Sequence, residues 1–461
     1  MEVDGIEMKQ GIPAPRGVWI PVIVGVILNP LNSSIIAVAL PALVKHFGQG
    51  TTAVTWIVSS YYLGNAVAQP IFGRLGDQWG HRRFVYAGLG LLAVSAVAAP
   101  LSPSLGIFLV WRVAQAVATS MVYPNSIALV RRHFPEQLGR VLGWIGMGAG
   151  IAIAIGPPLG GLLMDWAGWH AIFWLNIPLA GLAALGWAIL WPRLPATMTA
   201  RTERTDGWGI LFFTGAMTLW LLASTSLSRP AGAPALFLIA ALVATVALLL
   251  VERAAARPLI PLGWFRERQL ALASGVTVLS NVVMYSALYG LPLWIQTTRQ
   301  VSAATSGLLL LVFAGTTSLA SPWAGKMVQT RWRRAPMIGS GLLLVASAGI
   351  LVVFQASSWF GLLAGLALMG LSFAISNVVL QQVMIESVPS TETGRASGVY
   401  MLLRYLGTMV ASVLVAESLS RPGGGLQLFL LWLFVGLAST AAASGLHDHS
   451  AQEGHITQGK L

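Results

Sequence analysis

The sequence predicts an all-α integral membrane protein, built of two six-helix bundles with two further helices inserted between them. Three observations lead to this fold class: low charge, apolar runs long enough to cross a bilayer, and a charged loop that occurs twice. Of the 461 residues, 56% are hydrophobic and only 9% are charged, whereas a typical soluble domain has about 25% charged residues.

The apolar runs have the length of about 20 residues that a membrane-spanning helix needs. Strands of a membrane barrel are a poor alternative, because they alternate in polarity over about ten residues and these runs do not. We expect fourteen spanning helices at residues 18–42, 53–72, 84–102, 105–128, 139–163, 169–191, 208–226, 234–251, 270–295, 305–325, 336–355, 359–383, 396–418 and 425–445.

The distribution of basic residues predicts the orientation. With the N-terminus in the cytoplasm, most Lys and Arg residues fall in cytoplasmic segments, as the positive-inside rule requires. Both termini are then cytoplasmic, and the basic loops face anionic lipid headgroups. The net charge of +12 therefore does not indicate a nucleic-acid partner. The absence of Cys leaves the compartment open, while the short loops favour the cytoplasmic (inner) membrane of a bacterium.

A repeat divides the chain into two halves. The charged loop Gly73–Arg83 returns in altered form at Gly325–Arg334, 252 residues later (325 minus 73), and the first apolar runs begin at 18 and 270. Such a repeat indicates a transporter built by duplication. The expected segments are a cytoplasmic N-terminus 1–17, a first bundle 18–192, a linker 193–207, two inserted helices 208–251, a cytoplasmic loop 252–269, a second bundle 270–446 and a disordered tail 447–461.

The charged loop combines small residues with one acid. Gly73 and Gly76 allow two helix backbones to approach closely, as small residues do in lipid. Asp77 can approach the N-terminus of a helix in the other half, where the helix dipole favours an anion. The plainer alternative is that Asp77, Arg82 and Arg83 only set the topology.

Two features inside predicted helices are costly in lipid. Gly156-Pro157-Pro158 interrupts backbone hydrogen bonding, which is tolerated where protein covers the gap. It indicates either bending during a functional cycle, with close packing against the other half, or a static kink. Arg112 is an intramembrane cation on the same helix face as Gln115. That face is expected to line an aqueous cavity, unless Arg112 snorkels to the surface.

Further polar side chains repeat at helical spacing and predict a cavity near the midplane between the repeats. Amide and phenol groups with almost no charge suit amphipathic or lipophilic compounds, although each group could equally join two helices. The candidate cavity residues are Asn29, Asn32, Tyr62, Asn65, Gln69, Gln115, Asn281, Tyr285, Tyr289, Asn377 and Gln381.

These motifs resemble the major facilitator superfamily, in particular its fourteen-helix drug:proton antiporters of the EmrB/QacA type, over residues 18–446. The resemblance rests on the charged loop, on the run Trp169–Pro178, and on an antiporter motif in the fifth helix made of Gly143, Gly156, Pro157, Gly160 and Gly161. It implies the major facilitator fold and a proton-coupling role for Arg112. It also implies a gate that closes the cytoplasmic side, formed by Gly73, Asp77, Gly80, Arg82 and Arg83.

The sequence departs from this family in the first helix, where Asn32 stands in place of the carboxylate that would take the proton. A proton-coupled step needs a group that titrates within reach of both sides. No acid lies at the centre of a predicted span. Either a peripheral acid such as Glu417 or Asp165 serves, or transport is uncoupled.

We therefore expect a secondary transporter that exports small amphipathic or lipophilic compounds by alternating access, with protons as the coupling ion. The alternatives are an importer or uncoupled facilitator of a neutral metabolite, and a membrane sensor or scaffold that does not transport. Every His lies at a loop, a helix end or the tail, so no enzyme, metal site or cofactor is expected. An accessory efflux protein is a further candidate partner.

Overall fold

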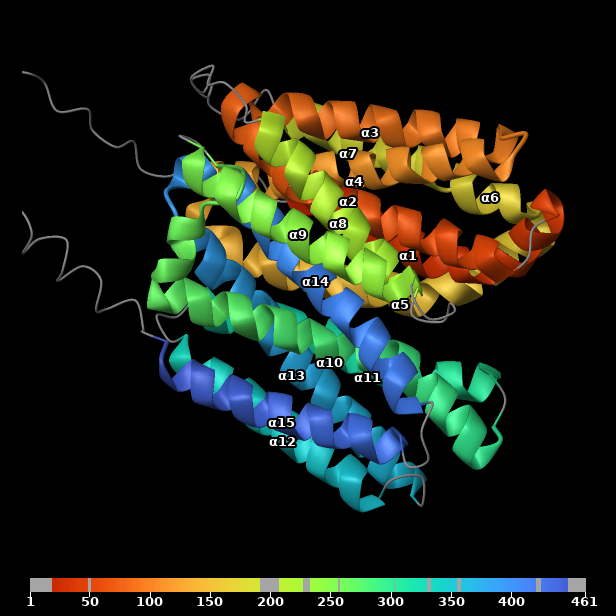
Figure 1. Ribbon diagram of the computed structural model, residues 1–461, viewed down its shortest axis with the longest axis vertical. Helices are drawn as coiled ribbons and strands as arrows, with labels where there is room; N and C mark the ends of the chain where they lie inside the picture. The colour runs from red at the N-terminus through yellow and green to blue at the C-terminus, as the bar shows by residue number, and fades with distance from the viewer. Residues whose placement is uncertain are drawn as a thin grey trace, which may run out of the picture.

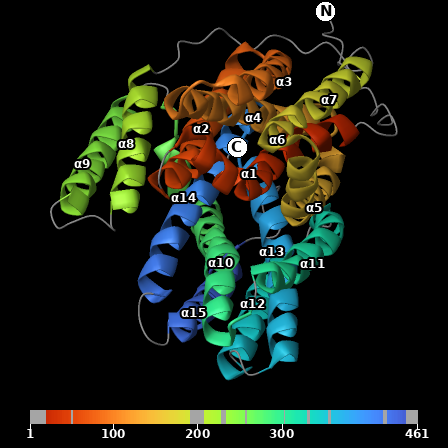
Figure 2. The ribbon, with the colours of Figure 1, turned by 90° about the vertical axis from the view of Figure 1, so that its right-hand side faces the viewer.

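The computed structural model describes residues 19–48, 51–190, 207–226, 233–255, 258–301, 303–329, 333–354, 358–419 and 424–446, and its regular elements there are all helical. The N-terminal segment, most of the linker and the tail predicted from the sequence lie outside these residues. Figure 2 shows two bundles one above the other, with a pair of helices at their side.

The first bundle contains six of the predicted spans. Its fifth span is a continuous helix in spite of the two prolines, and its sixth is divided at Leu175 into a short and a longer helix. The elements are α1 (Trp19–Phe47), α2 (Thr51–Trp79), α3 (His81–Ala98), α4 (Leu105–His133), α5 (Leu138–Ala167), α6 (Trp169–Trp174) and α7 (Asn176–Leu190), with short 3-10 turns η1 (Ala99–Leu101) and η2 (Pro135–Gln137).

The second bundle repeats this arrangement after the inserted pair. The pair consists of α8 (Gly207–Ser226) and α9 (Ala233–Ala254), and the 3-10 turn η4 (Leu262–Arg266) leads into the second bundle. The bundle itself contains α10 (Arg268–Arg299), α11 (Ala303–Gln329), α12 (Arg334–Phe354), α13 (Trp359–Glu386), η5 (Ser390–Glu392), α14 (Thr393–Leu419) and α15 (Gly424–Ser444).

The number of apolar spans corrects the count made from the sequence. Over the described residues, twelve helices are long and apolar enough to cross a membrane, whereas fourteen were expected. The two that differ are α2, which carries Arg74 and Asp77 among several amide and hydroxyl groups, and α8, whose apolar part is limited to Gly207–Ala223.

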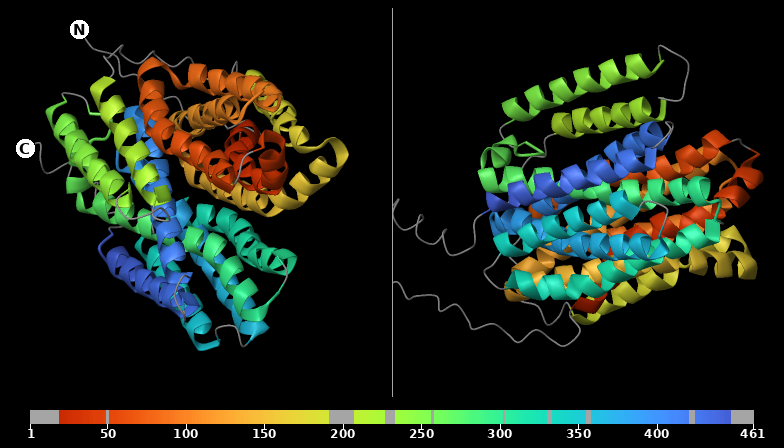
Figure 3. Two further views of the ribbon diagram at one scale, coloured as in Figure 1. Left: turned by 45° about the vertical axis from the view of Figure 1, so that its right-hand side comes forward. Right: turned by 90° about the horizontal axis from the view of Figure 1, so that it is seen from below.

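Polar and apolar side chains are distributed as they should be in lipid. Apolar residues such as Leu319 and Phe360 are each 81% exposed, while Asn65, Arg112 and Gln115 are buried between helices. A helix satisfies its own backbone hydrogen bonds, so only polar side chains have to be covered by protein. The long helices run roughly side by side (Figure 1), and the α8–α9 pair lies at one edge (Figure 3).

Close packing joins the two bundles at two places, where α2 crosses α14 and α5 crosses α11. At the second crossing, a Cβ atom on Gly143 would lie 2.6 Å from the backbone oxygen of Ser321 and 3.1 Å from the Cα atom of Gly325. Glycine is needed here because the two backbones touch.

The rest of the α5 motif corrects an expectation. Cβ atoms on Gly156 and Gly160 would meet Ser34 and Ile35 of α1, so these glycines pack within the first bundle and not against the other half. Gly161 has open space where its side chain would be. Pro157 is exposed and lines a cavity between the two bundles.

Candidate functional site

The loop after α2 holds the first bundle to the second. The Asp77 carboxylate accepts hydrogen bonds from the backbone amides of Gly394, at 2.9 Å, and Arg395, at 2.8 Å. These amides belong to the first turn of α14, where backbone N–H groups have no partner within their own helix. An anion there is also favoured by the helix dipole. Asp77 therefore caps a helix of the opposite bundle.

Small residues make this contact possible. Cβ atoms on Gly73 and Gly394 would each collide with the backbone of the other residue, so α2 and α14 meet without side chains between them. Gly76 leaves room for the Asn125 side chain, whose Oδ1 lies 2.8 Å from Nδ1 of His81. Gly80 has a φ of 98°, a left-handed conformation that favours glycine. It ends the turn between α2 and α3.

An arginine outside the predicted gate motif connects the bundles at this end. Arg82 and Arg83 are exposed, and Arg82 lies over the Tyr86 ring of its own helix. Arg131 of α4 connects the bundles here, since it donates to the Val388 carbonyl at 2.7 Å and to the Thr393 hydroxyl at 2.9 Å. We refer to the contacts of Gly73, Asp77 and Arg131 with residues 388–395 as the latch.

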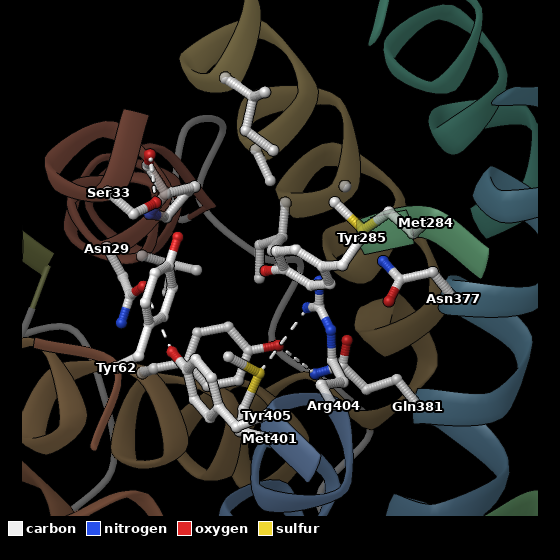
Figure 4. Close-up of a pocket in the computed structure, with 17 residues that line it drawn as sticks. Asn29, Ser33, Tyr62, Met284, Tyr285, Asn377, Gln381, Met401, Arg404 and Tyr405 are labelled. Carbon is white, nitrogen blue, oxygen red and sulfur yellow. Dashed lines mark hydrogen bonds between the residues drawn. The ribbon is translucent and has the colours of Figure 1, made fainter. Parts of the chain in front are cut away.

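A central cavity of about 70 Å³ lies between the bundles, beyond the latch. Helices α1, α2, α4, α5, α10, α13 and α14 all contribute to its wall. Its polar groups bridge the two bundles: Gln381 donates to the Tyr123 hydroxyl at 2.6 Å, and the Tyr405 hydroxyl donates to Oδ1 of Asn29 at 3.4 Å. Figure 4 shows Asn29 of the first bundle, with Gln381 and Tyr405 of the second, converging on this cavity.

A second cavity of about 740 Å³ adjoins the first and shares Ser33, Tyr62, Ile153 and Tyr285 with it. Its wall is largely apolar, and includes Leu308, Leu311 and Phe313 of α11. It extends between α5 and α11 toward the helix ends opposite the latch, because these residues lie in the half of α11 remote from Gly325. The size is that of pockets for drug-sized ligands.

The structure brings only part of the predicted cavity residues together. Asn29, Tyr62, Tyr285, Asn377 and Gln381 line the central cavity, and Tyr289 lines the larger one. The predicted positions that line neither are Asn32, Asn65, Gln69, Gln115 and Asn281. Each of these five is buried between helices.

Asn32 is held inside the first bundle. Its amide donates to Oδ1 of Asn176 at 2.7 Å and to the Leu28 carbonyl at 2.9 Å, and accepts from Asn176 at 3.0 Å. This reciprocal pair joins α1 to α7 and uses both donors of the Asn32 amide. The residue that replaces the expected acid is therefore a link between helices in this structure.

We expect Asn32→Asp to destabilise the protein and to give no new response to pH. A carboxylate has no donors for the oxygens of Leu28 and Asn176, and a buried polar group left without a partner costs about 1–3 kcal/mol. Unfolding in detergent, followed by tryptophan fluorescence, measures the loss, with Ser33→Ala as the neighbouring control. A variant of unchanged stability whose transport responds to a pH gradient would contradict this assignment.

Arg112 also lies away from both cavities. It is 1% exposed, donates to Oε1 of Gln115 at 2.8 Å, and its Cζ atom is 4.5 Å from the centre of the Tyr61 ring. The expected aqueous face of α4 is thus a buried cluster, and snorkelling does not occur. Through Tyr61, which is within 3.5 Å of the Thr119 hydroxyl, the cluster reaches the polar groups around Asn65.

The two peripheral acids line neither cavity. Asp165 is exposed near the end of α5, and Glu417 is exposed near the end of α14. Their role in proton coupling stays a prediction.

Sequence reasoning missed a cation of the central cavity, and it is the one that the described lining residues include. Arg404 of α14 lines it, together with Tyr405, Met401 and Tyr123. The sequence does contain an indication of this residue. Arg404 is an arginine within a predicted span, and such residues are functional candidates by default.

Comparisons with known proteins agree with this architecture. The family model of the Major Facilitator Superfamily matches residues 22–412. The uncharacterised MFS-type transporter YwoD of Bacillus subtilis (strain 168) is 34% identical over 442 residues, which cover 91% of this chain and 96% of that protein. The tetracenomycin C resistance and export protein of Streptomyces glaucescens is 32% identical over 428 residues, 88% of this chain and 77% of that protein.

A solved structure shows the same fold. The human organic anion transporter MFSD10 superposes with a TM-score of 0.71 at 17% identity, covering 94% of this chain and 100% of that one. At this identity the likeness concerns the fold alone. The match of the family model over most of the sequence, with the two bundles around a shared cavity, establishes that this chain belongs to the major facilitator superfamily.

Proposed function

We propose that this transporter exports small amphipathic or lipophilic compounds by alternating access. The observation that carries the proposal is the pair of adjoining cavities between the bundles, closed at one end by the latch. Substrate sites at the interface of two repeats are the rule in transporters of this build. An apolar cavity with a few polar groups at its base suits an amphipathic molecule.

The latch supports alternation between two states. Its contacts are the hydrogen bonds of the Asp77 and Arg131 side chains to residues 388–395 and the close approach of Gly73 to Gly394, which form or break together when two rigid bundles rock. In the structure the bundles touch at the latch, while the larger cavity lies toward the opposite ends of the helices. We propose that separation of Gly73 from Gly394 opens the cavities on the side of the latch.

We also propose that α2 and α8 cross the membrane, which gives fourteen spans with both termini in the cytoplasm of a bacterial inner membrane. With 29 residues, α2 is about 44 Å long at 1.5 Å per residue, more than the hydrocarbon core requires. It packs between α4 and α14. Trp220 of α8 donates to the Thr245 hydroxyl of α9 at 3.0 Å, which supports an α8–α9 hairpin.

The proposal that transport is outward is supported by the descriptions of two relatives. One relative is described as a resistance and export protein for tetracenomycin C, and another as multidrug resistance protein Stp of Mycobacterium tuberculosis (strain CDC 1551 / Oshkosh). Proton antiport has less support, because none of the described residues that line the two cavities is acidic. That observation favours the second candidate, an uncoupled facilitator.

Expression in bacterial cells that lack their own efflux pumps tests the proposal. We expect cells preloaded with a lipophilic dye, N-phenyl-1-naphthylamine, to release it severalfold faster than cells with an empty vector. A higher dye content would instead indicate an importer. Purified protein in liposomes that leaves dye movement unchanged would indicate a sensor or scaffold, and would contradict transport altogether.

A further inference from the structure

The central cavity carries one formal charge, and that charge is positive. Arg404 is the only ionisable residue other than tyrosine among the described residues that line the two cavities. A guanidinium stays protonated in proteins, so its charge persists in any state of the transporter. Figure 4 shows its side chain extending from α14 toward Tyr285.

The partners of this guanidinium are all neutral. Its Nε donates to Oδ1 of Asn281 at 3.2 Å, one terminal nitrogen lies 3.7 Å from the Met401 sulfur, and its Cζ atom is 5.9 Å from the centre of the Tyr400 ring. Within the described part of the chain, no carboxylate forms an ion pair with it. By contrast, Arg333 pairs with Glu386 near the latch.

A buried cation without an anion is unfavourable in lipid. Arg404 has five N–H donors, and the neutral contacts above leave several of them for a ligand. Asn281 is itself anchored, since its amide donates to the Thr277 carbonyl at 2.8 Å. It therefore orients the guanidinium while leaving the charge uncompensated.

The central cavity, which holds this charge, adjoins the larger apolar cavity. The hydroxyls of Tyr123 and Tyr285 lie around the central cavity and can donate to an anion. Tyr62 and Ile153 are shared with the larger cavity, whose wall includes Leu288 and Phe313. A molecule with an acidic head and an apolar body would place the head at Arg404 and the body in the larger cavity.

We propose that this transporter selects amphipathic organic anions, such as aryl sulfonates and carboxylates, through an ion pair with Arg404. The inference rests on the proposed function and adds the sign of the substrate's charge. A lipophilic cation is disfavoured, since it would be desolvated beside a fixed positive charge with no acid to receive it.

The test compares three naphthalene probes of similar size in liposomes of zwitterionic lipid, which removes anionic lipid as a competing ligand. The probes are anionic 8-anilinonaphthalene-1-sulfonate, neutral N-phenyl-1-naphthylamine, and a trimethylammonium derivative of the latter. Binding is read from probe fluorescence and transport from uptake. We expect the wild-type protein to bind and move the anion at least tenfold better than the cation.

Variants of Arg404 assign the preference to this residue. In Arg404→Gln the ratio of anion to neutral-probe uptake should fall at least tenfold, and Arg404→Lys should restore part of it. Arg299→Gln is the matched control, because Arg299 lies at the end of α10, against the Trp359 ring, and should keep the wild-type ratio.

The outcomes separate this inference from the proposed function. Equal handling of anion and cation by the wild-type protein would overturn the inference while leaving transport intact, even if Arg404→Gln failed to fold. An unchanged ratio in folded Arg404→Gln would also overturn it. Binding of the anion at Arg404 without uptake of any probe would instead contradict the proposed function, and the absence of anion binding would overturn the inference.

Discussion

Gly73→Ala is expected to prevent closure of the latch and to reduce transport about 100-fold. A Cβ atom at this position would lie 2.7 Å from the carbonyl carbon of Gly394 and 3.2 Å from the Arg395 amide nitrogen. These are backbone atoms of α14, so relief requires the two bundles to move apart. Overpacking of this kind costs about 3 kcal/mol or somewhat less, which corresponds to about 100-fold in the population of the closed state.

Gly90→Ala is the matched control for this variant. Gly90 lies on α3 with open space where its side chain would be, so the substitution has the same effect on helix propensity without a collision. Transport by Gly90→Ala should stay within twofold of wild type. Equal loss of transport in both variants would show that the effect does not come from the latch.

Asp77→Asn removes the charge of the latch with little change in shape. The asparagine side chain keeps one acceptor, while its NH₂ group faces an amide of Gly394 or Arg395 that the carboxylate bonded. Charge-assisted hydrogen bonds are about twice as strong as neutral ones. We therefore expect a loss of about tenfold in turnover, smaller than for Gly73→Ala, with normal insertion into the membrane.

Opening of the latch can be measured directly because the chain contains no Cys. Ala149→Cys places a single small thiol in the wall of the central cavity. In inside-out vesicles an impermeant maleimide should label this thiol faster in the Gly73→Ala background than in the wild-type background. Slower labelling would mean that Gly73 is needed to open the site and not to close it.

The latch was predictable from the sequence for a physical reason. Charged residues are scarce in spanning segments, so the loop at Gly73–Arg83 and its repeat stand out. An acid between two spans has few partners other than the N-terminus of another helix. Asp77 accordingly meets the first turn of α14. The partner of Arg131 was not predictable, because nothing in its own helix indicates that residues 388–393 lie beside it.

The residues that line the cavities were only partly predictable from the sequence. Helical periodicity shows which residues share a face, but not which neighbouring helix covers that face. Asn29 and Asn32 lie less than one turn apart, yet one lines the cavity and the other pairs with Asn176 of α7. The same ambiguity placed Gln115 in the cavity, whereas it accepts from Arg112 within the first bundle.

Membrane potential, not a pH gradient, is expected to drive accumulation of the anionic probe. A proton-coupled step needs a titrating group that reaches the transport path. Asp165 and Glu417 lie outside both cavities, and Asn32 is paired. A substrate with one negative charge is itself driven by the potential, with about 2.3 kcal/mol per 100 mV. That free energy corresponds to a concentration ratio of about 50-fold.

The sign of this effect follows from the charge of the substrate. In liposomes with a potassium gradient and valinomycin, the anion should accumulate on the positive side, and the neutral probe should equilibrate without accumulating. In a cell with a negative interior, the same force expels an anion, so export would need no proton. Accumulation of the sulfonate in response to a pH gradient at zero potential would instead require a coupling acid. Glu417→Gln and Asp165→Asn would then identify it.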